Sequence, residues 1–464
     1  MARPLLSKEA ARYTSGGGRE HCSLCRHFSP RRGGLCARVL GGVSPGGWCK
    51  LFSREIRAMV PDASSFNGGG GGAPALSLDF MTPGTLDPRI TFTRASATAT
   101  YFDSAGTMQT AATNAPRWDN DPATLALRGL LIEEARTNVL LHSSAFNNAA
   151  WSKINCSLAA GITGPDGTVA SVGVIPGNGL IAHLDQSFAV VSGTTYTLSV
   201  FAKAGSQSSV VMFMPAAWWA DALQRTATFN LITGVVSGLI GSGVSGISTP
   251  VGGGWYRISI TATPTLSASG SVQITRAVVT GDGVNTAYYV WGAQLEAGAF
   301  ATSYIVTAGT SAMRAADVAS IATAPWLVPA TGTVATDFML ANRTTPDQTL
   351  FDMAGSTATV RHRVAGGSGW VIRAAIGAVG FNTANAVASQ NIVAKAALAW
   401  GGTTGASVLN GGTVATAAIS TDAAGATAMT VGSAVGAGYL NGWLRQTRYW
   451  NRALTNAELQ TVTT

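Results

Sequence analysis

The chain has 464 residues, so several domains, roughly three, are expected rather than a single one. Only 11% of the residues are charged, glycine is abundant at 56 residues, and the β-branched and aromatic content is high enough for a core, which favours packed β-sheet domains and excludes a disordered chain. The sequence has no apolar run long enough for a transmembrane helix, and residues 1–9 lack the apolar segment of a secretory signal. We therefore expect folding in a cytosol and no membrane partner.

The N-terminal residues 1–57 carry the net charge and most of the cysteines. They hold eleven Lys or Arg and three acidic residues, which accounts for the net charge of +8 of the whole chain. They also hold four of the five cysteines, Cys22, Cys25, Cys36 and Cys49. In a cytosol such a group predicts a metal site rather than disulfides. Four thiolates can bind one [4Fe–4S] cluster or one zinc ion, and the spacing leaves both open, with free thiols as the third possibility.

Aromatic residues accompany these cysteines. Tyr13 precedes the group, Phe28 follows the Cys22–Cys25 pair, and Trp48 stands directly before Cys49. The pattern resembles the high-potential iron–sulfur proteins and small cluster-like modules of tailed phages. The resemblance implies a [4Fe–4S] cluster bound by the four cysteines, with Tyr13, Phe28 and Trp48 packed around it, and zinc stays the alternative. Because ten residues between Cys25 and Cys36 are fewer than in the redox proteins, we expect a structural cluster.

Residues 58–74 contain five consecutive glycines, Gly68 to Gly72, and predict a flexible linker. In residues 75–150 three separated blocks follow in order: TFTRAS from Thr91, NAPR from Asn114 and RGLLIEEARTN from Arg128. This series resembles a connecting module of tailed-phage and prophage virion proteins, particularly tail-fibre and minor structural proteins. We interpret Glu133, Glu134 and Arg136 as members of ion pairs between strands or modules, not as catalytic groups.

Residues 151–317 alternate between apolar and polar side chains, as in Tyr196 to Val200, and turn signals separate the alternating segments. This pattern predicts an antiparallel β-sandwich or jelly roll, with Cys156 in its core. Its last block, residues 288–296, resembles the final strand of carbohydrate-binding-module-like domains in phage fibres. Sugar rings stack on exposed indole faces, and this makes Trp218 and Trp219 candidates, although weak ones, for glycan binding. The alternative places these two residues in the core or at a subunit interface.

Residues 325–464 continue the β pattern and end in a strand followed by a short helix, in which Thr455 and Glu458 have the spacing of a capping box. This ending resembles laminin-G/concanavalin-like jelly rolls. The expected fold class is therefore all-β: a small Cys-rich N-terminal metal module followed by two antiparallel β-sandwich or jelly-roll domains.

The resemblances together imply a structural fibre and adhesion protein of a phage virion, assembled in the host cytoplasm and without enzymatic activity. The N-terminal module would dock on other virion proteins, in the portal–adaptor region, tail or capsid, and the sandwiches would bind a host surface glycan. A homotrimer is the expected assembly. A nucleic-acid partner is not expected, because the basic head suits an acidic protein surface. The alternatives are a capsule-degrading tail-spike enzyme, a capsid decoration protein without receptor binding, and a redox carrier.

Overall fold

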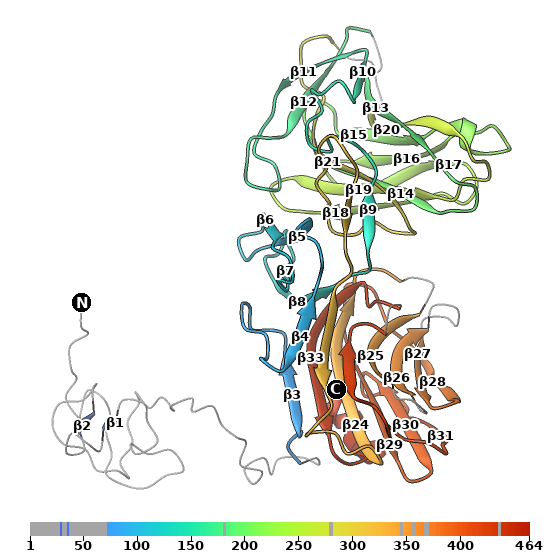
Figure 1. The fold of residues 1–464 in the computed structure, drawn as a ribbon. Helices are drawn as coiled ribbons and strands as arrows, with labels where there is room; N and C mark the ends of the chain where they lie inside the picture. The colour runs from blue at the N-terminus through green and yellow to red at the C-terminus, as the bar shows by residue number, and fades with distance from the viewer. Residues whose placement is uncertain are drawn as a thin grey trace. The chain divides into compact units, whose positions relative to one another are not determined.

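The computed structural model describes residues 28–29, 35–36, 72–179, 182–277, 282–343, 347–354, 359–365, 371–434 and 438–464. The chain divides into two units, Met1–Gly68 and Gly69–Thr464. In the first unit, the described residues form the strands β1 (Phe28–Ser29) and β2 (Leu35–Cys36), which pair antiparallel with Phe28 opposite Cys36. In the second unit almost all regular structure is antiparallel strand, so the predicted all-β class is confirmed (Figure 1).

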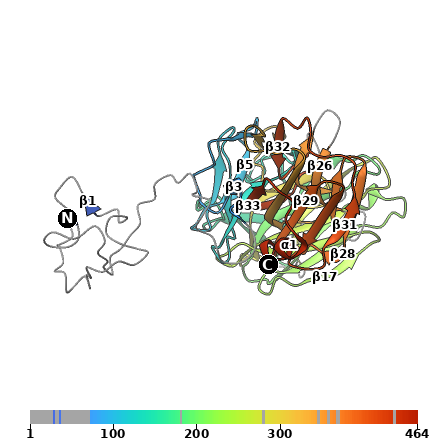
Figure 2. The same ribbon diagram turned by 90° about the horizontal axis from the view of Figure 1, so that it is seen from below.

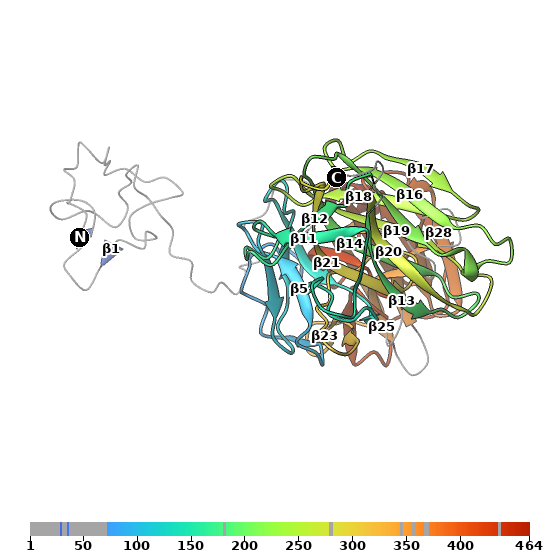
Figure 3. The same ribbon diagram turned by 90° about the horizontal axis from the view of Figure 1, so that it is seen from above.

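The first sandwich of this unit consists of two sheets that pack face to face (Figure 3). One sheet has, in spatial order, β10 (Ser152–Ile154), β13 (His183–Ala189), β20 (Ser269–Ala277), β15 (Ser209–Met214), β16 (Arg225–Asn230) and β17 (Val236–Ile240). The other has β11 (Cys156–Ala160), β12 (Val172–Pro176), β21 (Tyr288–Ala297), β14 (Tyr196–Ala204), β19 (Trp255–Ala262) and β18 (Ser245–Pro250).

The alternation predicted for β14 holds, but its polar face is not exposed. Leu198 and Val200 lie in the sandwich core, as expected. Thr197 and Ser199 point to the other face and are buried as well, because the chain after β21 covers them. The Thr197 hydroxyl donates to the carbonyl of Gly298, for example, over 2.8 Å. The polar face of this sheet is therefore an internal surface, and it forms one wall of the site described below.

The second sandwich is built from the C-terminal residues and from part of the segment 75–150 (Figures 1 and 2). Its first sheet has the order β28 (Val379–Val387), β27 (Val371–Ile376), β26 (Thr359–Ala365), β25 (Gln348–Ala354), β32 (Ala428–Val431), β23 (Val318–Ala322) and β4 (Ile90–Thr93). Its second sheet has β31 (Ala415–Ala418), β30 (Thr404–Leu409), β29 (Val393–Gly401), β24 (Thr331–Leu340), β33 (Gly442–Trp450), β8 (Leu127–Ile132) and β7 (Trp118–Asn120), and β3 (Leu76–Asp79) also pairs with β33.

Four strands of residues 75–150, namely β3, β4, β7 and β8, thus complete the sheets of the second sandwich. Their apolar side chains enter the core of this sandwich, among them Leu76, Leu78, Phe92, Leu130 and Ile132. The hairpin β5 (Ala99–Phe102) and β6 (Met108–Ala111) stands apart from both sandwiches' sheets, and β9 (Arg136–Asn138) pairs with β22 (Ala312–Arg314) where the chain passes between the sandwiches. The domain boundaries drawn from the sequence stay predictions. Strands from residues 75–150 and from the C-terminal residues nevertheless pair in the same sheets.

The short C-terminal helix α1 (Asn456–Val462) has the predicted capping box. The Thr455 hydroxyl accepts from the amide of Glu458, and the Glu458 carboxylate accepts from the amide of Thr455 over 2.8 Å. In the described part of the chain, no helix is both long and apolar enough to cross a membrane.

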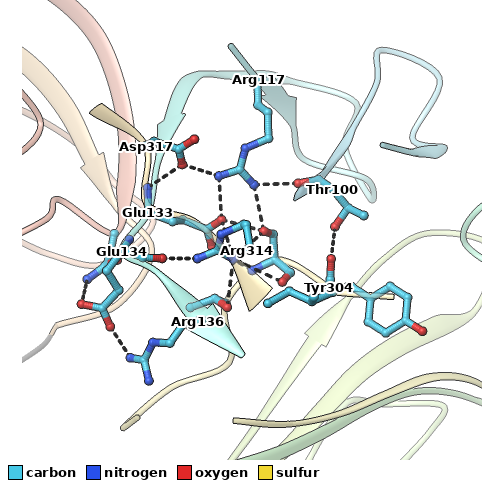
Figure 4. A network of polar contacts seen from close by, with 12 residues as sticks. Thr100, Arg117, Glu133, Glu134, Arg136, Tyr304, Arg314 and Asp317 are labelled. Atoms are coloured by element: carbon cyan, nitrogen blue, oxygen red, sulfur yellow. Dashed lines mark hydrogen bonds and ion pairs between the residues drawn. The ribbon is translucent and has the colours of Figure 1, made fainter. Parts of the chain in front are cut away.

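A buried ion network connects the chain segments that run between the two sandwiches (Figure 4). The side chain of Asp317, directly before β23, is fully buried and accepts from Arg94 Nη1 at 3.0 Å and from Arg117 Nη2 at 2.5 Å. Its Oδ2 also accepts from the amide of Glu133, directly after β8, at 3.0 Å. One carboxylate therefore binds residues that follow β4, precede β7 and follow β8.

Glu133 extends the network towards the first sandwich. Its Oε2 lies 2.9 Å from Arg117 Nη2 and 3.2 Å from Arg314 Nη1, and its two oxygens accept from the amide and hydroxyl of Ser303. Burial alone would raise the pKa of Glu133, but Arg314, Arg117 and the bonds from Ser303 outweigh it and lower the pKa to about 2. Beside it, Glu134 pairs with Arg136, so the expectation of ion pairs for both glutamates is confirmed.

We predict that Asp317→Asn lowers the free energy of unfolding by about 3–5 kcal/mol, because it leaves the buried guanidinium of Arg94 without a charge partner and that of Arg117 with Glu133 alone. Asp87→Asn is the matched control: Asp87 pairs with Arg89, whose side chain is half exposed, and exposed pairs contribute about 0–1 kcal/mol. Urea unfolding of both variants measures the difference. Equal losses would contradict a structural role for the network.

The network also predicts a sensitivity to acid. The pKa of Glu133 in the folded chain lies below the ordinary value of 4.5, so its ionised form contributes stability above pH 4.5, and this contribution is lost as the pH falls towards 2. Glu133→Gln, which resembles the protonated carboxyl group, should therefore be less stable than the wild type at about pH 7, and the gap should shrink at about pH 3. Urea unfolding at the two pH values tests this. A gap independent of pH would contradict it.

Candidate functional site

A cavity of about 240 Å³ lies in the second unit, where three parts of the chain meet. The hairpin β5–β6 and strands β7 and β8 form one wall, β14, β18, β19 and residues 301–304 of the first sandwich form another, and residues 341–342, 390–391 and Trp443 of the second sandwich close the third. The volume lies just below the range of about 300–1,000 Å³ that is typical of small-molecule pockets, which suits a single small ligand unit.

The wall at the second sandwich is centred on Trp443, on β33. Its indole Nε1 donates to Asp119 Oδ2 over 2.9 Å, and the guanidinium of Arg128 stacks on its ring, 4.6 Å from the centroid. Arg128 also pairs with Asp121 at 2.8 Å. Asp119, Arg128 and Trp443 come from β7, β8 and β33, which are neighbours in one sheet, and Asp121 follows β7 directly, so the sheet positions these side chains.

Asp119 is a buried acid beside this cavity. Burial raises its pKa to about 6, although the hydrogen bond from the Phe102 amide and the nearby charge of Arg128 act in the opposite direction. Its Oδ1 accepts from that amide at 2.7 Å and its Oδ2 from Trp443. The carboxyl group therefore connects the β5–β6 hairpin to the second sandwich, and it changes its ionisation around pH 6.

The wall at the first sandwich is the covered polar face of β14, β19 and β18. Arg257, on β19, donates from Nη1 to the carbonyl of Thr302 at 2.5 Å and from Nη2 to the hydroxyl of Ser199 at 3.1 Å. Its guanidinium packs over the ring of Phe201, 5.3 Å from the centroid. Ile247, 45% exposed on the edge strand β18, lies at the rim of the cavity. Apolar surface and hydrogen-bonding groups thus alternate across this wall.

Among the described residues, the lining of this cavity includes none of the site residues expected from sequence. Cys22, Cys25, Cys49, Tyr13 and Trp48 fall outside the described residues, and Phe28 and Cys36 are described only as paired strand backbone. The cluster therefore stays a prediction. Within the described part of the chain, no three His, Cys, Asp or Glu side chains form a group that could hold a metal ion.

Trp218 and Trp219 lie at the end of η3 (Ala216–Trp218) in the core of the first sandwich, 0% and 3% exposed. Their rings pack against each other and Trp218 packs against Tyr196, so neither ring has an exposed face on which a sugar could stack. The core position given as their alternative fits this placement. Cys156 is partly buried against the same core, and burial raises the pKa of its thiol to about 11.

Sequence reasoning missed the cavity because its walls come from three distant segments. Arg257 was recognisable only as a large cation among the small polar residues of an alternating strand, next to Ser259 and Thr261. Asp119 and Asp121 are neighbouring acids in the sequence, but nothing in their spacing predicts that they lie near Trp443. The signal available was the unusual position of a charge on a β-strand in a chain that has few charges.

No protein-family model matches this chain, and no curated protein sequence matches it. Among solved structures, domain 4 of AbnA, an extracellular arabinanase from Geobacillus stearothermophilus, in complex with arabinotriose, is similar at 11% identity over 32% of this chain and 73% of that one, with a TM-score of 0.29. The CBM40 of the Ruminococcus gnavus IT-sialidase is similar at 15% identity over 29% of this chain and 83% of that one (TM-score 0.25). Domains LG4-5 of the mouse laminin alpha1 chain are similar at 8% identity over 70% of this chain and 92% of that one (TM-score 0.23). These likenesses concern backbone folds, so the function has to be argued from the side chains of the site.

Proposed function

We propose that this protein is a structural fibre or adhesion protein of a phage virion, in which the Cys-rich N-terminal residues 1–57 dock on the particle and the β-sandwich unit binds a glycan of the host surface. The cavity between the two sandwiches is the glycan-binding site of this proposal. Its location would be the virion, and its partners would be other virion proteins, the host glycan and further copies of the chain in a homotrimer.

The observation that carries the glycan part is the mixed character of the cavity. Sugars present apolar C–H faces and a ring of hydroxyl groups, and they need a wall that offers both kinds of contact. Phe201, Ile247 and Val251 offer apolar surface, while Arg257 and Ser259 offer hydrogen-bonding groups on the same wall. Strands and ion pairs hold the walls of the cavity in place. The protein therefore loses little conformational entropy when a ligand binds.

The virion part is supported by the sequence blocks that resemble phage virion proteins. Arg94, Arg117 and Glu133 lie in those blocks, and they meet Arg314 and Asp317 in the ion network beside the cavity. The residues of these sequence blocks therefore contribute to one structural feature, namely the junction between the two sandwiches. A junction of this kind suits a fibre that presents β-sandwiches in a fixed order.

A second candidate function, a capsule-degrading enzyme, has one observation in its favour. Asp119 and Glu133 both line the cavity, and their pKa values are shifted apart, to about 6 and about 2, as in a general acid and its ionised partner. However, Glu133 is held by two guanidinium groups and by Ser303, and Asp119 by Phe102 and Trp443. Because both carboxylates are already engaged by protein groups, we favour glycan binding without cleavage.

The full chain should bind one or more members of a panel of purified bacterial surface polysaccharides without shortening them. Biolayer interferometry measures binding, and size-exclusion chromatography after incubation measures polysaccharide length. Ile247→Trp should weaken binding by about tenfold or more, because the larger side chain closes the rim of the cavity. Val191→Trp is the matched control, since Val191 is also exposed (58%) and does not line the cavity.

A fall in polysaccharide length that disappears in Asp119→Asn would favour the enzyme instead. A chain that binds no polysaccharide in the panel would favour a capsid decoration protein. Equal binding by the Ile247→Trp and Val191→Trp variants would place the glycan outside this cavity.

The metal centre is tested separately. We predict about four irons per chain and a broad visible absorption band in full-length protein purified without oxygen, both lost in Cys22→Ser and Cys49→Ser. Cys156→Ser is the matched control and should keep both signals, because Cys156 belongs to the first sandwich. One zinc per chain without colour would replace the cluster by the zinc alternative, and a chain without metal would contradict the site.

A further inference from the structure

Arg257 differs from the other guanidinium groups around the cavity and the ion network. Arg94, Arg117, Arg128, Arg136 and Arg314 each have a carboxylate within 4.0 Å. Among the described residues, Arg257 has none: its guanidinium contacts a carbonyl, a hydroxyl and an aromatic ring. A cavity wall therefore carries a positive charge whose hydrogen-bond partners in the protein are all neutral, and the carboxylates of Glu296 and Glu133 act on it only at longer range.

Arg257 also keeps hydrogen-bonding capacity. A guanidinium has five N–H donors in one plane, and two of them are used by Thr302 and Ser199. The Nε–H group is buried, has no partner in the described part of the chain, and is too little exposed for a ligand to reach. The remaining N–H groups are on Nη1 and Nη2, and a ligand that supplies a negatively charged acceptor to them gains affinity because hydrogen bonds between charged groups are stronger than neutral ones.

The neighbours of Arg257 on the sheet define what else the ligand would contact. Thr249 on β18 and Phe201 on β14 stand directly opposite Arg257 in the two adjacent strands. Ser259, two residues along β19, lies on the same face and pairs in the same way with Ile247 and Ser199. Phe201, Thr249, Ile247, Arg257 and Ser259 all line the cavity. The wall is thus one sheet face with a cation, hydroxyl groups and apolar side chains side by side.

We propose that the cavity binds a sugar acid, with the carboxylate of the sugar on Arg257, its hydroxyl groups towards Ser259 and Thr249, and an apolar ring face on Ile247 and Phe201. This rests on the proposed glycan-binding function and narrows its ligand to acidic saccharides, such as chains that contain uronic acid units. The planar fork of an arginine matches a carboxylate in two places, and the apolar neighbours suit a carbon ring better than they suit a bare inorganic anion.

The test compares D-glucuronate with its methyl ester, which keeps the ring and hydroxyl groups but removes the charge, on the full chain by isothermal titration calorimetry. The acid should bind at least about tenfold more tightly than the ester. Arg257→Gln should remove this preference, whereas Arg89→Gln, at an exposed ion pair that does not line the cavity, should keep it. Circular dichroism and the Tm establish that each variant is folded.

If Arg257→Gln does not fold, Ile247→Trp replaces it and should abolish the binding of glucuronate by closing the rim. Equal affinity for acid and ester would overturn the role of Arg257, and so would unchanged acid preference in either cavity variant. Acetate or inorganic phosphate binding as tightly as glucuronate would overturn the sugar part. Absence of glucuronate binding would also overturn the inference. In each case, binding of neutral polysaccharides in the panel described above would leave the proposed glycan-binding function standing.

Discussion

The burial of Asp317 between two arginines is the constraint on which the arrangement of the second unit depends. A carboxylate and two guanidinium groups without solvent exposure are tolerated only when every charge has a partner, so the segments that carry Arg94, Arg117 and Asp317 have to meet. Through Glu133 the same constraint reaches Arg314 and Ser303, at the exit of the first sandwich. The cavity lies directly beside this network, and its walls keep their spacing because the network cannot open without exposing unpaired charges.

The same constraint accounts for the burial of several charged side chains in a chain that has few charged residues. An exposed ion pair contributes little, whereas a buried network is costly to break and tolerates one geometry only. The strands of residues 75–150 enter the C-terminal sheets, and the network forms at the point where they leave for the first sandwich. Packing and electrostatics therefore select the same topology, which favours a single well-defined junction.

The sequence predicted the parts of the fold that depend on local patterns. Alternation in Tyr196 to Val200 marked a central strand, and the spacing of Thr455 and Glu458 marked the helix start, because strand period and helix capping are set by neighbouring residues. It did not place β3, β4, β7 and β8 in the C-terminal sheets, since pairing over hundreds of residues leaves no local signal. For the same reason Trp218 and Trp219 were open to two readings until their burial was known, and Arg257 was not recognised as part of a site.

Hydrogen–deuterium exchange with a bound polysaccharide shows whether a glycan binds at the junction between the two sandwiches. We predict slower exchange in three separate stretches that line the cavity, namely residues 100–102, 247–257 and 390–391, and unchanged exchange in the loop after β13 that carries Val191. Protection confined to loops away from these three stretches would mean that the glycan binds on a sandwich surface and not at the junction.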